Sequence, residues 1–305
     1  MTPLRGIVPP IITPFSPDGR VDVPSLDRLV DHLLDHGVDG LFVLGSTGQV
    51  AYLTDDERAA VLGRVVERTA GRVPILVGVP ELSGRRAADA GRRAIAAGAD
   101  AVVATAPMYA LIDDEELDRH FRIVAEAVGA PVFAYDIPVR VHRKLDNDLL
   151  LRLGRDGVIA GVKDSSGDDD NFVALVAAND AAGRPLQLLT GHEIRCEEMF
   201  RAGADGAVPG LANVDPAGYV RMWKAAQAGD WATVAAEQAR LKRLFDIVVV
   251  PQGRSLDSRG IGAFKAALAC LGVIDSATMP DPLSSLTNAE VAEVQAVLAE
   301  VGLGG

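Results

Sequence analysis

The sequence predicts an α/β protein, a (β/α)8 or TIM barrel with a helical extension at its C-terminal end. Eight short apolar runs alternate with longer amphipathic stretches, as eight βα units require. The apolar runs are rich in Val, Ile and Leu without strict alternation, which is typical of parallel strands buried on both faces. The early glycine turn, Gly45-Ser46-Thr47-Gly48, lacks the Gly-x-Gly-x-x-Gly spacing of a dinucleotide-binding sheet, so a doubly wound fold is disfavoured.

The eight expected strands are separated by stretches long enough for a helix. They cover residues 6–12, 40–45, 74–79, 101–106, 131–137, 158–164, 186–190 and 206–209. Between the first two, residues 25–36 place Leu26, Leu29 and Leu33 on one helical face. Later helices are expected to begin after the capping residues Thr54, Asp113 and Asp168.

After about residue 229 the pattern is helical only. Helices are expected at residues 231–247, 260–271 and 287–301, with a loop at 249–258. We therefore expect two parts, a barrel catalytic domain at residues 1–228 and a C-terminal helical extension at residues 229–305. No low-complexity tract or flexible linker separates them.

Composition excludes several classes of protein. The 305 residues are 49% hydrophobic, which is enough for a sizeable core, and a net charge of −12 argues against a nucleic-acid partner. Two cysteines, Cys196 and Cys270, are too few for a disulfide scaffold. The apolar run at 247–250 is far shorter than the roughly 20 residues a bilayer requires, and the start of the chain does not resemble a signal peptide. We expect a soluble, cytoplasmic protein that contacts no membrane.

Lys163 is the most informative candidate for chemistry. In a barrel the active site lies at the carboxyl ends of the strands, and Lys163 ends the apolar run that begins at Val158. The other four lysines, at positions 144, 224, 242 and 265, fall in helical or loop segments and are expected to be solvated. Burial favours the neutral, nucleophilic form of an amine, which can attack a carbonyl and form a Schiff base. The alternative is a structural lysine paired with Asp164.

Other strand ends carry polar residues that could join Lys163. Tyr135 ends the neighbouring strand, where a phenol could move protons or simply fill the core. Arg140 follows in the next loop and could hold a carboxylate or lie on the surface. The turn that contains Ser46 and Thr47 could present N–H groups and hydroxyls to an anion. Tyr109 ends the fourth strand and is either a core aromatic or a site residue.

Together these segments resemble the Schiff-base, pyruvate-utilising aldolases, the family that includes dihydrodipicolinate synthase and N-acetylneuraminate lyase. The resemblance runs from about Leu4 to Leu271. The segments that carry it are Pro9-Pro10-Ile11-Ile12-Thr13-Pro14-Phe15, Gly45-Ser46-Thr47-Gly48, Ala106-Pro107-Met108-Tyr109, Tyr135-Asp136-Ile137-Pro138, Gly161-Val162-Lys163-Asp164-Ser165-Ser166 and Ala202-Gly203-Ala204-Asp205-Gly206.

The resemblance implies a role for each candidate. Lys163 would form the Schiff base with pyruvate or another 2-keto acid, and Tyr135 would transfer protons to and from the imine. Of Ser46 and Thr47, one would hold the pyruvate carboxylate together with the Gly48 turn, and the other would relay protons. The remaining implied site residues are Tyr109, which would reach into a neighbouring subunit, and Ala207 or Val208, which would form an apolar wall over the imine. Tyr109 thereby implies a homo-oligomer, usually a dimer of dimers, with a dimer as the minimal working unit.

The aldehyde partner stays open at this level. Arg140 matches the arginine with which dihydrodipicolinate synthase holds aspartate semialdehyde, and it favours that condensation. Gln49-Val50, Met108 and the segment 253–262 depart from the synthase pattern and suit a 2-keto-3-deoxy-sugar-acid or 4-hydroxy-2-oxo-acid aldolase or dehydratase. A binding protein that holds a keto acid without turnover is the rival from another class. No metal or cofactor is expected, because of the five histidines only His192 follows a strand.

Overall fold

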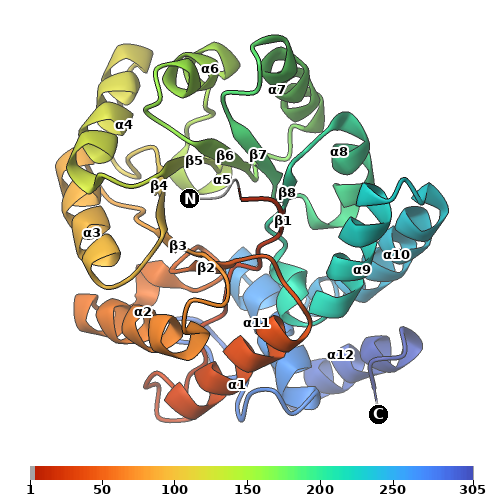
Figure 1. The fold of residues 1–305 in the computed structure, drawn as a ribbon. Coiled ribbons are helices and arrows are strands. Elements are labelled where there is room, and N and C mark those ends of the chain that lie inside the picture. Colours follow the sequence, from red (N-terminus) through yellow and green to blue (C-terminus); the bar gives the residue numbers. More distant parts are fainter. Residues whose placement is uncertain (1–3, 305) are drawn as a thin grey trace.

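A parallel sheet curves around the centre of the molecule (Figure 1). The computed structural model describes residues 4–304, and eight strands of these residues form the sheet. They are β1 (Gly6–Ile7), β2 (Leu41–Val43), β3 (Ile75–Gly78), β4 (Ala101–Thr105), β5 (Val132–Asp136), β6 (Gly161–Asp164), β7 (Gln187–Thr190) and β8 (Gly206–Ala207). Each of the eight expected strands is therefore present, most of them a few residues shorter than predicted.

The sheet closes on itself between its first and second strands. β1 pairs with β8, and the order then runs through β7 to β2. Just after β1, Pro10 forms a parallel bridge to Phe42 of β2. The Ile11 N–H donates to the Phe42 carbonyl at 2.8 Å, and the Phe42 N–H donates to the Pro9 carbonyl at 2.9 Å. This closure protects the edges of the sheet, and it confirms the predicted barrel.

Helices surround the barrel (Figure 1). Those that precede the C-terminal extension are α1 (Val23–Asp35), α2 (Asp55–Thr69), α3 (Gly84–Ala96), α4 (Asp114–Val128), α5 (Pro138–Val141), α6 (Asn147–Arg155), α7 (Asp169–Ala181), α8 (Cys196–Ala202) and α9 (Pro216–Gln227), with 3-10 turns η1 (Val50–Tyr52), η2 (Glu193–Arg195) and η3 (Gly210–Asn213). Thr54, Asp113 and Asp168 are the N-caps of α2, α4 and α7 as predicted, because each side chain accepts a hydrogen bond from a first-turn N–H.

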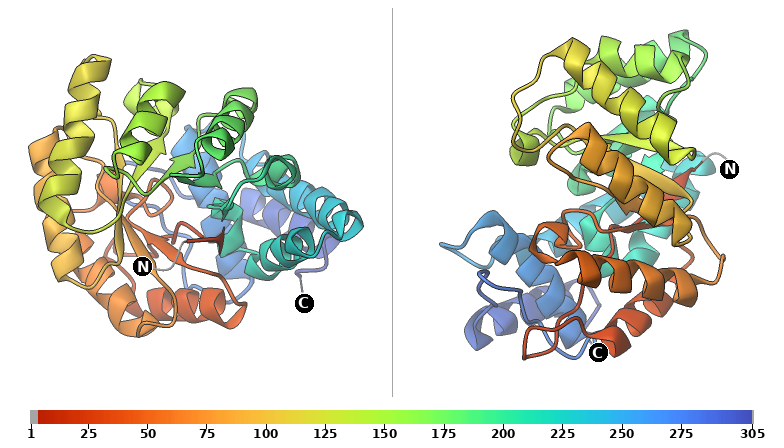
Figure 2. Two further views of the ribbon diagram at one scale, coloured as in Figure 1. Left: turned by 45° about the horizontal axis from the view of Figure 1, so that its top comes forward. Right: turned by 90° about the vertical axis from the view of Figure 1, so that its left-hand side faces the viewer.

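The C-terminal segment consists of α10 (Trp231–Leu244), η4 (Phe245–Val248), α11 (Leu256–Cys270) and α12 (Asn288–Glu300). The predicted loop at 249–258 is too long at its C-terminal end, because Ser255 caps α11 and the helix starts at Leu256. In the right-hand view of Figure 2, α11 and α12, in blue, lie on the side of the molecule away from the N-terminus. They are therefore near the end of the barrel to which the strands run.

Barrel and C-terminal helices share one hydrophobic core. The same cluster of buried side chains contains Phe42 and Phe133 from the barrel and Leu241, Leu268 and Leu298 from the C-terminal helices. The division at residues 228 and 229 stays a prediction, and its outermost residues, 1–3 and 305, lie outside the described residues. No helix among residues 4–304 is long and apolar enough to cross a membrane. The cytoplasmic location stays a prediction.

Candidate active site

The candidate site forms around Lys163 inside the barrel. In the register of β5 and β6, Tyr135 lies opposite Lys163. The Lys163 Nζ lies 4.1 Å from the centroid of the Tyr135 ring and 4.6 Å from that of Phe42, which belongs to β2. Strands β2 and β5 are not neighbours in the sheet, so contacts to both rings place the amine in the barrel interior. The Lys163 side chain is buried, at 5% exposure.

The residues that follow Tyr135 and Lys163 in β5 and β6 point to the opposite side of the sheet, because side chains alternate along a strand. Asp136 and Asp164, which lie opposite each other in register, face outward, and Lys144 forms ion pairs with both of them. The alternative prediction that Lys163 pairs with Asp164 is therefore wrong. The prediction of a solvated Lys144 holds only in part, because its side chain is 32% exposed and its main partner, Asp136, is fully buried.

Lys163 and Tyr135 interact electrostatically. Burial alone raises the pKa of the Tyr135 phenol, but the nearby Lys163 and the hydroxyls of Ser165 and Ser46 outweigh it and lower the pKa below its usual value. A phenol with a lowered pKa gives up its proton more readily, which suits a group that exchanges protons with a bound substrate. Ser165 follows β6 directly and was not singled out by the sequence analysis.

The glycine turn lies at the end of β2. The Gln49 N–H donates to the Ser46 carbonyl, and the Thr13 hydroxyl donates to the Gly48 carbonyl at 2.7 Å. A Cβ at Gly48 would lie 2.9 Å from the Ile11 carbonyl, so this close approach requires glycine. Leu44 and Gln49, on either side of the turn, have φ of 57° and 58°. Such left-handed backbone in non-glycine residues is costly and persists where the surrounding structure enforces it, often at functional sites.

A pocket adjoins Tyr135 and the glycine turn. Of the predicted site residues, Ser46, Tyr135 and Arg140 line this pocket. The others are not part of its lining: Lys163, which lies behind the Tyr135 ring, Thr47, Gly48, Tyr109 and Val208. Val208 is buried directly after β8, where its N–H donates to the Thr190 carbonyl. The roles predicted for all these residues stay predictions.

Arg140 has a partner that the sequence analysis missed. Its guanidinium binds the Asp257 carboxylate through both terminal nitrogens, with Nη1 3.0 Å from Oδ2. The Tyr52 hydroxyl donates to the same Oδ2 at 2.8 Å. Tyr52 belongs to η1 and Asp257 to the first turn of α11, and both line the pocket. Burial raises the pKa of the Asp257 carboxyl, but Arg140 and Tyr52 outweigh it, and the pKa lies below the usual value. No local sequence signal indicates this contact across 117 positions.

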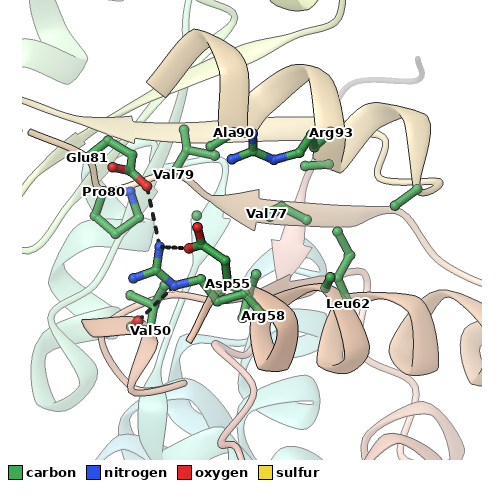
Figure 3. Close-up of a pocket in the computed structure, with 15 residues that line it drawn as sticks. Val50, Asp55, Arg58, Leu62, Val77, Val79, Pro80, Glu81, Ala90 and Arg93 are labelled. Atoms are coloured by element: carbon green, nitrogen blue, oxygen red, sulfur yellow. Dashed lines mark hydrogen bonds and ion pairs between the residues drawn. The ribbon is translucent and has the colours of Figure 1, made fainter. Parts of the chain in front are cut away.

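A second pocket lies between α2, α3 and the ends of β2 and β3 (Figure 3). Arg58 lines both pockets, and its Nε donates to the Val50 carbonyl at 3.1 Å. Its Nη1 lies 3.3 Å from Glu81 and 3.6 Å from Asp55, contacts that Figure 3 shows as dashed lines. The positive charge of Arg58 is thus compensated within the chain.

Glu193 is a further carboxylate near Lys163. One of its oxygens accepts hydrogen bonds from the N–H groups of Gly210 and Leu211. Burial raises the pKa of the Glu193 carboxyl to about 7, although these N–H groups and Lys163 oppose the rise. Glu193 was missed, but its place shortly after β7 is a signal that could have found it, because barrel sites form at the carboxyl ends of strands.

Tyr109 lies outside the pocket. It follows β4 and is 88% exposed, next to Leu111 at 98%. In a single chain its side chain is at the surface, so the core interpretation is wrong, and the role in a neighbouring subunit stays a prediction.

Lys265 is a second buried lysine. The prediction of a solvated side chain is wrong, because α11 packs it fully against the core, 4.4 Å from the centroid of Phe15. Its Nζ donates to the Thr278 carbonyl at 3.0 Å, and burial lowers its pKa well below the usual value. This contact ties α11 to the segment that follows it. Among residues 4–304, no cluster of three His, Cys, Asp or Glu side chains could hold a metal ion.

Comparisons with known proteins agree with the fold and the motifs. The model of the dihydrodipicolinate synthetase family matches residues 3–301. A 4-hydroxy-tetrahydrodipicolinate synthase of Kineococcus radiotolerans is 32% identical, over 99% of this chain and 95% of its own length. An uncharacterised DapA-like lyase of Halobacterium salinarum is 33% identical, over 98% and 95%.

Solved structures give the same result. The chain resembles YagE, an E. coli K12 prophage protein of the dihydrodipicolinic acid synthase family in complex with pyruvate, with a TM-score of 0.91 and 28% identity over 98% of this chain and 99% of that one. It also resembles the chloride-inhibited dihydrodipicolinate synthase of Acinetobacter baumannii complexed with pyruvate, with a TM-score of 0.89 and 28% identity over 99% and 100%.

Proposed function

This chain belongs to the dihydrodipicolinate synthetase family, whose members are lyases and aldolases, and from that premise we propose that it is a pyruvate-dependent lyase which works through a Schiff base on Lys163. The observation that carries the proposal is the placement of the Lys163 amine. It lies inside the barrel against the Tyr135 and Phe42 rings, and its neighbour Asp164 is occupied by Lys144. Two similar solved structures hold pyruvate.

In the proposed reaction the neutral Lys163 amine attacks the ketone carbon of pyruvate. The carbinolamine loses water, and Tyr135 moves the protons that this step requires. The protonated imine withdraws electrons, so a methyl proton can leave and give an enamine. The enamine carbon attacks the carbonyl carbon of an aldehyde, a C–C bond forms, and the alkoxide takes up a proton. Water then hydrolyses the imine and frees Lys163. Cleavage is the reverse sequence.

The glycine turn is proposed to bind the carboxylate of pyruvate. N–H groups and the hydroxyls of Ser46 and Thr47 lie at the end of β2, on the same side of the barrel as Lys163 and Tyr135. Donors fixed in place before the reaction cost no reorganisation in the transition state. The proposed working unit is a dimer or a dimer of dimers, because the exposed Tyr109 would complete the site of a second copy.

Two reactions are candidates, and they differ in the second substrate that reacts with pyruvate. The curated relative from K. radiotolerans supports aspartate semialdehyde, the substrate implied by Arg140. The Arg140–Asp257 pair favours the second candidate, a 2-keto-3-deoxy-sugar-acid or 4-hydroxy-2-oxo-acid reaction, because the guanidinium already holds a carboxylate of the chain.

Borohydride reduction in the presence of pyruvate tests the central proposal. We expect peptide mass spectrometry to find a reduced pyruvyl adduct on Lys163. Lys163→Ala should abolish the adduct and turnover, whereas Lys242→Ala, which changes an exposed lysine on α10, should affect neither. Wild-type protein without an adduct would refute the mechanism. An adduct without exchange of the pyruvate methyl protons into deuterated water would favour the non-catalytic binder.

A further inference from the structure

We propose that Asp257 determines which aldehyde the site accepts. By pairing with Arg140, it would favour aldehydes with an uncharged, hydroxyl-bearing chain over aldehydes that carry a carboxylate. The inference rests on the proposed function, because it concerns the second substrate of that reaction.

The geometry of the pair leaves little of Arg140 for a substrate carboxylate. Both terminal nitrogens of the guanidinium contact the Asp257 carboxylate, which is the fork-to-fork arrangement that a bound carboxylate would otherwise adopt. The Asp257 side chain is 11% exposed and the Arg140 side chain 35%. Tyr52 donates to the Oδ2 of Asp257, the oxygen that Arg140 Nη1 also contacts, and so helps to hold the carboxylate in place. Asp257 thus occupies the position of a substrate carboxylate.

The charges around the pocket add to the effect. The charged side chains of its lining are Arg58, Arg140 and Asp257. Arg58 is paired with Glu81 and lies close to Asp55, so neither arginine offers an uncompensated positive charge. A substrate carboxylate that approached Arg140 would come close to Asp257, and like charges in a partly buried site repel strongly.

The rest of the lining suits a neutral substrate. Much of it is apolar, with Met108, Ile137 and Val141 among its residues. Ser46 and Tyr52 also belong to the lining, and both are partly exposed. Their hydroxyl groups can form hydrogen bonds with a substrate without adding charge to the pocket.

The test compares two aldehydes with the wild-type enzyme and Asp257→Asn. The measured quantity is the ratio of kcat/KM for glyceraldehyde to kcat/KM for aspartate semialdehyde, each with saturating pyruvate. We expect the wild type to favour glyceraldehyde and Asp257→Asn to shift the ratio about tenfold or more toward the acidic aldehyde. Glu290→Gln is the matched control, because Glu290 forms a similar two-pronged pair with Arg254 outside the pocket. It should leave the ratio unchanged.

A double variant, Arg140→Gln with Asp257→Asn, keeps the test decisive if the single variant does not fold. It removes both charges, so the preference for glyceraldehyde should persist. If Arg140 instead holds the substrate carboxylate, the wild type will favour aspartate semialdehyde and the double variant will lose that preference. Either a wild-type preference for the acidic aldehyde or an unchanged ratio in Asp257→Asn would overturn the proposal. The adduct on wild-type Lys163 is measured first, with pyruvate alone, so a failure of the proposed function is recognised separately.

Discussion

Lys144 offers a stability prediction that follows from the two faces of β5 and β6. Its ammonium is the cation between Asp136, which is fully buried, and Asp164, whose carboxylate oxygen lies 3.8 Å away. Lys144→Met keeps the length of the side chain and removes the charge. We expect the variant to be strongly destabilised at pH 8, because two buried carboxyl groups then lack their cation.

The pKa of Asp136 shows how much free energy its burial already costs in the wild type and over which pH range. Burial raises the pKa of its carboxyl from an ordinary value near 3.8 to about 6, even though Lys144 opposes the rise. A rise of this size corresponds to about 3 kcal/mol of folding free energy. Because the folded pKa is raised, the ionisation of Asp136 costs no stability below pH 3.8. As the pH rises from 3.8 to about 6, the free energy of unfolding falls by this amount. Without Lys144 the folded pKa would rise further, so the loss would extend to higher pH.

Thermal unfolding of Lys144→Met and wild type at pH 8 and pH 5 measures this effect. Breaking a buried ion pair costs roughly 3–5 kcal/mol, or about 6–10 °C in Tm, and we expect this loss at pH 8. At pH 5 Asp136 is largely protonated, so the loss should shrink to less than half. Lys242→Met, on the surface of α10, should change Tm little at either pH. Equal losses at both pH values would refute the argument.

Two further predictions concern the proposed chemistry and the closure of the barrel. Tyr135→Phe should lower kcat about 10²–10⁴-fold with little change in the KM for pyruvate, because it removes only the hydroxyl that moves protons. Tyr219→Phe is the control and should retain kcat, since its buried hydroxyl donates to the backbone carbonyl of Glu193. Gly206→Ala should lower the free energy of unfolding by about 1–3 kcal/mol in thermal unfolding, since its Cβ would lie 2.1 Å from the Gly6 carbonyl oxygen. Gly63→Ala, which has open space around it on α2, should stabilise the protein slightly, and similar values for the two variants would contradict the packing argument.

Several parts of the candidate site could be predicted because they depend on local patterns. The apolar run that ends at Lys163 identifies a buried strand, and the period of two then places Lys163 and Asp164 on opposite faces. Tyr135 follows in the same way from the strand before it. Capping residues such as Thr54 can be predicted from the sequence, because the hydrogen bond they form joins residues only three positions apart. Lys265 was misjudged because α11 is buried along much of its length, so its periodicity does not separate an exposed face from a buried one.

The sequence by itself determined the barrel, the order of its elements and the lysine at the end of the sixth strand, because each is encoded in the periodicity of a short segment. Only the tertiary structure decided which charges meet. Lys144 rather than Lys163 pairs with Asp164, and Asp257, expected in a loop, holds Arg140 from the start of a C-terminal helix. The first contact depends on how the loop after β5 folds back over the outer face of the sheet. The second depends on how the barrel and the C-terminal helices pack together, and no local pattern records the distance between segments that are more than 100 residues apart.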